Sequence, residues 1–152
     1  MTLDRRRSLT AAASALLLAA CGDPTAPTAP IATEVLDAQV IYRVATAAER
    51  LPSVRATGNA GAITVRVSRP ALCGTLVSAR VARARGTVAV VASVAADPAS
   101  LCGQSLAVGV VEYSVLVARV PPGMWTVQVF EGLADGPPRF LADTQVRVPG
   151  GA

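Results

Sequence analysis

The chain has 152 residues, of which 14 are arginine and 10 are acidic, and it contains neither lysine nor histidine. A formal net charge of +4, scattered along the chain, gives no basic footprint for nucleic acid. With aromatic residues at only 3%, we expect a core built mainly from valine, leucine and alanine.

Residues 1–20 have the three parts of a secretory signal. An arginine run at positions 5–7 precedes a mostly apolar stretch of 12 residues, Leu9–Ala20, and small residues close the segment. The stretch is shorter than the roughly 20 residues of a membrane-spanning helix, which favours a cleaved signal. Removing it takes away three arginines and Asp4 and lowers the net charge from +4 to +2.

The end of this signal, Leu18-Ala19-Ala20-Cys21, resembles the lipobox of bacterial lipoproteins. The resemblance implies that Cys21 is acylated, for example with palmitate, and becomes the first residue of a membrane-anchored mature chain. Each buried methylene of such a chain contributes about 0.8 kcal/mol to anchoring. The resemblance also implies the bacterial cell envelope, and Gly22 favours the outer membrane or cell surface over the inner membrane.

Two alternatives stay open at this end of the chain. One is an ordinary cleaved signal that happens to have a cysteine nearby. The other concerns the export route, because Arg6-Arg7-Ser8-Leu9 resembles a twin-arginine motif, so export to the periplasm uses either that route or the general secretory one.

Residues 21–33 are predicted to form a tether that starts with the lipidated Cys21. The stretch GDPTAPTAPIAT at 22–33 carries three prolines, a density that favours extended polyproline II and cannot pack a core. At about 3.1 Å per residue, this tether would hold a domain about 35 to 40 Å from a membrane. We expect one folded domain over residues 34–152.

Residues 34–51 fit either a helix or a strand. Leu36, Val40 and Val44 recur at helical spacing, whereas Val40, Tyr42 and Val44 alternate as in a strand. Because β-branched and aromatic residues favour strands, we predict a strand near 39–45.

From residue 62 onward, six segments alternate apolar and polar residues, as expected for strands that bury one face. They are 62–69, 74–83, 87–95, 110–120, 125–130 and 139–148. Turn formers separate them: Gly58-Asn59 with Gly61, Ala84-Arg85-Gly86, Asp97-Pro98, Pro121-Pro122-Gly123 and Asp135-Gly136-Pro137. Gly123 is expected to take a positive φ. The pattern predicts an all-β fold, a single antiparallel β-sandwich of about seven strands.

The segment YSVLVARVPPGMWTVQVFEG at 113–132 resembles a hairpin common in immunoglobulin-like and prealbumin-like domains. The resemblance implies a fold and no particular activity. Trp125 lies after both Cys73 and Cys102, so the antibody arrangement, with a tryptophan between two sheet-bridging cysteines, is absent.

Cys73 and Cys102 lie in similar short segments, ALCGTL and SLCGQS. If Cys21 is lipidated, an even pair remains in an oxidising compartment, and this favours a disulfide. Closing that loop would stabilise the fold by about 3 to 4 kcal/mol. Two cysteines without histidine do not easily complete a zinc site, and no Cys-x-x-Cys indicates a redox pair.

Catalytic signals are weak, and we predict no enzymatic activity, no cofactor and no metal. The segment Gly103–Ala107 faintly resembles a nucleophile elbow, but no histidine or lysine is present to activate its serine. The acids form no evident pair for glycoside hydrolysis, and Glu131 with Asp135 lacks the dense acidic pattern of a calcium loop.

Binding surfaces remain. Trp125 and Tyr113 are candidate ligand-binding residues, with Tyr42, because their rings can stack on a ligand, although alternation also places the first two in the core. Arginines predicted on solvated faces would recognise an acidic glycan or protein if two or three lined one patch. They are Arg66, Arg80, Arg119 and Arg147. Our leading hypothesis is a lipid-anchored accessory module that binds a protein partner. The alternative is a carbohydrate- or small-ligand-binding module, and a carboxylate-based hydrolase comes third.

Overall fold

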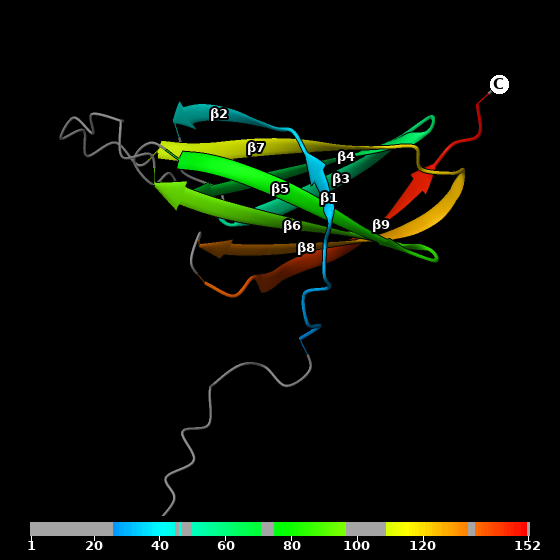
Figure 1. Cartoon of the computed structure of the whole chain (residues 1–152). Helices are drawn as coiled ribbons and strands as arrows, with labels where there is room; N and C mark the ends of the chain where they lie inside the picture. Colours follow the sequence, from blue (N-terminus) through cyan, green and yellow to red (C-terminus); the bar gives the residue numbers. More distant parts are fainter. Residues whose placement is uncertain are drawn as a thin grey trace, which may run out of the picture.

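The computed structural model describes residues 26–44, 46, 50–70, 75–96, 109–133 and 136–151. Within these ranges every regular secondary-structure element is a β-strand, which confirms the all-β prediction (Figure 1). No helix within them has the length and apolar character needed to span a membrane.

The described part of the chain forms nine strands, more than the seven expected. They are β1 (Glu34–Leu36), β2 (Ala38–Val44), β3 (Ser53–Asn59), β4 (Ala62–Pro70), β5 (Thr75–Ala84), β6 (Thr87–Ala96), β7 (Gly109–Ala118), β8 (Gly123–Leu133) and β9 (Arg139–Val148). A five-stranded sheet has the order β1-β5-β6-β8-β9, and a four-stranded sheet has the order β2-β7-β4-β3. The prediction of a wholly antiparallel arrangement is wrong in one place, because β6 and β8 pair in parallel.

The strand predicted near 39–45 is confirmed as β2, and the six downstream segments are confirmed as β4 to β9. The predicted turn at Ala84-Arg85-Gly86 also forms: Ala84 pairs with Thr87, and Gly86 has a φ of 71°. β5 turns Ala79 and Val81 inward with Arg80 exposed between them, so its period of two was readable from the sequence. In β6 the residue between Val88 and Val90, Ala89, is buried as well.

The two strands missed from the sequence are β1 and β3. β1 has three residues, too few to show an alternation. β3 has the sequence SVRATGN, whose Gly58 and Asn59 suggested a turn. The turn instead follows β3, where Asn59 pairs with Ala62 and Gly61 has a φ of 73°.

Gly58 is required by a close approach between the two sheets. A Cβ placed on this residue would lie 2.1 Å from the carbonyl oxygen of Arg147, in β9 of the other sheet. The edge strands β3 and β9 therefore come together on one side of the molecule, and only glycine allows this distance.

The hairpin expected over residues 113–132 is wrong, because β7 and β8 belong to different sheets. Arg119 has a φ of 56°, and the Val120 N–H donates to the carbonyl oxygen of Gly61 at 2.9 Å. Pro121 and Pro122 then offer no N–H to a neighbouring strand. The chain crosses to the five-stranded sheet, and Gly123 takes the expected positive φ, 144°.

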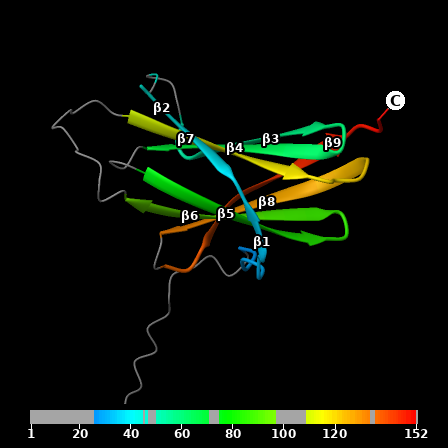
Figure 2. The same cartoon turned by 45° about the horizontal axis from the view of Figure 1, so that its top comes forward.

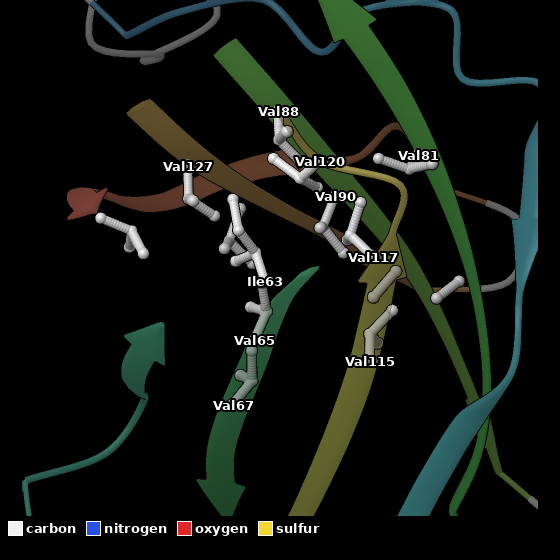
Figure 3. Packing of buried hydrophobic residues seen from close by; sticks show 14 of the residues in the cluster. Ile63, Val65, Val67, Val81, Val88, Val90, Val115, Val117, Val120 and Val127 are labelled. Atoms are coloured by element: carbon white, nitrogen blue, oxygen red, sulfur yellow. The ribbon is translucent and has the colours of Figure 1, made fainter. Parts of the chain in front are cut away.

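The two sheets face each other across a core dominated by valine, as Figure 3 shows. Alternate residues of β4 and β7 point inward from one sheet, and those of β5, β6 and β8 point inward from the other, as predicted. They include Ile63, Val65, Val67, Val115, Val117, Val81, Val88, Val90 and Val127. No leucine is fully buried in the part that the structure describes; Leu36 and Leu141 pack at the margin.

On the other side of the molecule, the chain of β1 and β2 passes from the five-stranded sheet to the four-stranded one (Figure 2). Arg83 of β5 stabilises this crossing through hydrogen bonds. Its Nε and Nη2 donate to the two carboxylate oxygens of Glu34 in β1, each at 2.9 Å. Its Nη1 donates to the carbonyl oxygen of Ala118, at the end of β7, at 2.8 Å.

Tyr42 adds a second link on this side. The Thr75 N–H in β5 donates to the Tyr42 hydroxyl oxygen at 2.7 Å, and that hydroxyl donates back to the Thr75 carbonyl oxygen at 3.0 Å. The hydroxyl of Tyr42 therefore links β2 to β5 of the other sheet.

Candidate binding face

The residues with sequence-predicted roles lie in different parts of the molecule. Cys21, Cys73 and Cys102 lie outside the residues that the structure describes, as does the signal segment 1–20. Tyr113 and Trp125 are both described, and the structure does not bring them together in one site.

Tyr113 is fully buried between the sheets, with 0% of its surface exposed. Its hydroxyl donates to Glu131 Oε2 in β8 at 2.9 Å. Burial, followed by the negative charge of Glu131, raises the pKa of Tyr113 far above its usual range. The phenol is thus a neutral donor that joins the sheets, and its ring offers no free face.

Trp125 is half-buried and packs against the margin of the core. Its Nε1 donates to the carbonyl oxygen of Pro121 at 2.9 Å, within the crossover between β7 and β8. The polar atom of the indole is therefore used inside the domain.

Glu131 also holds Arg69 of β4. Arg69 Nη1 lies 2.5 Å from Glu131 Oε1, and the two side chains are 15% and 13% exposed. Sequence reasoning weighed Glu131 only as a calcium ligand with Asp135, which lies outside the described residues. The alternation Val127, Val129, Glu131 was the signal that this carboxylate points inward.

A different surface has the features of a binding site: the outer face of the four-stranded sheet. The register places side chains from all four strands in two rows across it. One row is Gln39, Ser114, Arg66 and Arg55, and the next is Ile41, Glu112, Ser68 and Ser53. Arg55 and Arg66 are direct cross-strand partners, and both are exposed.

A hollow of about 120 Å³ lies among these rows, and we call it the arginine hollow. Its lining is Arg43, Ser53, Arg55, Arg66, Ser68 and Glu112. Glu112 Oε2 accepts a hydrogen bond from Ser68 Oγ at 3.1 Å and lies 3.8 Å from Arg43 Nη2. The carboxylate of Glu112 is therefore already engaged within the hollow.

A second hollow of about 520 Å³, the larger hollow, continues across the same face. Its lining is Val35, Leu36, Asp37, Gln39, Thr64, Ser114 and Leu116. Leu116 and Val35 remain 56% and 70% exposed there. Ser114 and Gln39 belong to the row of Arg66, so the two hollows adjoin.

The patch differs in membership from the one that sequence reasoning considered. Arg66 belongs to it, whereas Arg80 lies in β5 of the other sheet and Arg119 lies in the crossover. Its other members are Arg43 and Arg55. Counting outward from the turn at Gly61 would have placed Arg55 opposite Arg66, but β3 was not recognised as a strand.

In the part of the chain that the structure describes, no group of three or more histidine, cysteine or acidic residues lies close enough together to bind a metal ion. The surface chemistry available there is that of the two hollows: guanidinium, hydroxyl and aliphatic groups. Comparison of the chain with protein-family models, with curated proteins and with solved structures finds no match.

Proposed function

We propose that this chain is a lipid-anchored, non-enzymatic accessory module of the bacterial cell envelope. In this proposal Cys21 holds it to the membrane, and the outer face of the four-stranded sheet binds a protein partner. The observation that carries the proposal is the pair of adjoining hollows, which combine exposed aliphatic side chains with arginines on one face. Exposed apolar surface rimmed by polar groups is typical of protein interaction sites.

The same face argues for a protein over a sugar. No aromatic side chain lines either hollow. Tyr113 and Trp125 have their polar atoms bonded within the domain, and Tyr42 bridges to the opposite sheet. A carbohydrate- or small-ligand-binding module is the alternative function, and it would need an aromatic platform elsewhere on the chain.

For the folded part, residues 34–152, we propose a β-sandwich of the immunoglobulin-like or prealbumin-like kind. Its two facing sheets with a shared valine core support this class. β1 begins at Glu34, directly after the proline-rich segment, and its Val35 lines the larger hollow. A tether ending there would present the binding face close to its own attachment point.

Site-specific photocrosslinking in the envelope tests the docking face. We expect a photoreactive amino acid in place of Thr57, which is exposed in β3 beside the arginine row, to capture a partner. The same group in place of Arg85, which is exposed in the turn between β5 and β6 and lines neither hollow, is the control and should capture none. Leu116→Arg should abolish the Thr57 crosslink, because it fills the larger hollow with a charged side chain. Equal crosslinking from both positions, or from neither, would refute the proposed face.

A further inference from the structure

We infer that the partner segment is acidic: a carboxylate side chain enters the arginine hollow, and an aliphatic side chain beside it enters the larger hollow. The inference rests on the proposed function and specifies the chemistry of its partner. It is carried by the register of β3 and β4, by the contacts of Glu112 and by the position of the two hollows.

The first step is the pairing of like charges. Arg55 and Arg66 are directly opposite in an antiparallel ladder, where Cβ atoms are about 4.5 to 5.5 Å apart. Like charges at such positions destabilise a sheet. Neither guanidinium makes an ion pair or a side-chain hydrogen bond within the part of the chain that the structure describes. An anion bound between them would relieve this repulsion.

The second step is the charge of the hollow. Three arginines and one glutamate line it, which leaves two positive charges uncompensated. Glu112 lies toward Arg43 and Ser68 and is bonded there, so it does not neutralise the Arg55–Arg66 pair. Guanidinium groups bind carboxylates through two parallel hydrogen bonds, which makes this pair suited to an acidic side chain.

The third step is size and placement. The arginine hollow, at about 120 Å³, is the smaller of the two and offers room for a carboxylate group beside its guanidinium groups. Thr64, in the larger hollow, lies two residues from Arg66 on β4, about 7 Å along the strand. An acidic and an aliphatic side chain on one short segment therefore reach both hollows together.

The aliphatic side chains decide between a protein and an acidic glycan. Val35 and Leu116 stay largely exposed in the larger hollow, and a polar sugar chain would leave them so. A peptide that carries leucine or valine two residues from glutamate covers them and neutralises the arginines at once.

Titration calorimetry on the mature domain tests this inference. The probe is a synthetic peptide in which glutamate and leucine stand two residues apart, separated by serine, so that both point to one face of an extended chain. It is compared with the same peptide carrying lysine in place of glutamate, with oligogalacturonate and with inorganic phosphate. We expect the first peptide to bind most tightly. Arg55→Glu should weaken its binding at least about tenfold, the factor that corresponds to loss of a charge-assisted pair.

Arg55→Glu has a second readout that shows its folded state. A carboxylate opposite Arg66 replaces repulsion with attraction, so the melting temperature should rise while peptide binding falls. Arg85→Glu, in the turn between β5 and β6 and away from both hollows, makes the same change in net charge and should leave the affinity within about twofold.

Three outcomes would overturn the inference. They are equal weakening by Arg85→Glu, tighter binding of oligogalacturonate or phosphate than of the acidic peptide, and no binding of that peptide. The crosslinking result at Thr57, and its loss in Leu116→Arg, does not depend on any of these three outcomes. The acidic-partner inference can therefore fail while the proposed docking face stands.

Discussion

At the scale of single residues, two arginine–carboxylate contacts stabilise the fold in different environments, one between the sheets and one within the five-stranded sheet. Arg69 and Glu131 are mostly buried and share the network with the hydroxyl of Tyr113. Glu34 and Arg83 lie at an exposed edge. The first contact pairs two mostly buried charges, although Arg69 Nε has no hydrogen-bond partner among the described residues. The second contact depends on the ionisation of one carboxylate.

The buried network of Tyr113, Glu131 and Arg69 predicts that substitutions at different members lower the free energy of unfolding by different amounts. Tyr113→Phe removes one donor to Glu131 and should lower the free energy of unfolding by about 1 to 2 kcal/mol. Glu131→Gln leaves the Arg69 guanidinium charged and mostly buried without a counter-charge, and should cost about 2 to 4 kcal/mol. Urea denaturation followed by circular dichroism measures both. Asp143→Asn, on an exposed position of β9, is the control and should change little; equal losses for the three variants would contradict the network.

The edge contact predicts a pH dependence. Hydrogen bonds from Arg83 hold the pKa of Glu34 below its ordinary value of 4.5. A carboxyl group with a lowered folded-state pKa contributes stability above that ordinary value and loses it as the pH falls through the folded pKa. Glu34→Gln should therefore unfold at lower urea than the wild type at pH 7, and the difference should vanish in acid. A difference that persists when the carboxyl is protonated would exclude this origin.

At the scale of elements, strand pairing is governed by contacts that the local pattern does not contain. β7 and β8 both alternate as a hairpin should, yet they lie in different sheets. The bond between Val120 and Gly61, which are 59 positions apart in number, fixes the crossover. Period and turn residues predicted most of the strands, whereas their partners depended on long-range packing.

The position of the edge strand β3 also depends on a long-range contact, and this contact can be tested. Gly58→Ala should lower the free energy of unfolding by at least about 2 kcal/mol, because its Cβ would meet backbone of β9 and the sheets would have to separate. Gly150→Ala, with open space around the added Cβ, is the matched control. Thermal denaturation of both variants decides the matter, and an unaffected Gly58→Ala would show that the two edges do not touch.

The candidate face was foreseeable only in part. Alternation placed Arg66 on a solvated face of its strand, as found. The hollow also needs Arg55, which stands in a segment with glycine and asparagine that does not read as a strand. The contribution of Val35 depends on a strand of three residues, which is too short for any periodic signal.

At the scale of the whole molecule, the topology bears on the cysteines. Pro70 pairs with Val110 and Thr75 pairs with Ala96, so the segments that contain Cys73 and Cys102 leave from the same end of the sheets. The disulfide that we propose between Cys73 and Cys102 would join these two segments, and it would leave Cys21 as the remaining cysteine for lipidation.

One experiment examines both roles of the cysteines. Non-reducing mass analysis of the exported protein should find Cys21 acylated at the N-terminus and Cys73 joined to Cys102. Cys21→Ser should shift the protein out of the membrane fraction, with Cys73→Ser as the control that stays bound. Two free thiols would refute the disulfide, and membrane retention of Cys21→Ser without an acyl mass on the wild type would refute the anchor.

The position of Trp125 has a practical consequence. It is the only tryptophan of the chain, and its indole is bonded to the carbonyl of Pro121 where the backbone passes from one sheet to the other. Intrinsic tryptophan fluorescence therefore reports on one place, the crossover between β7 and β8, and is not an average over the domain. The emission of this protein is a built-in optical reporter of whether the two sheets remain together.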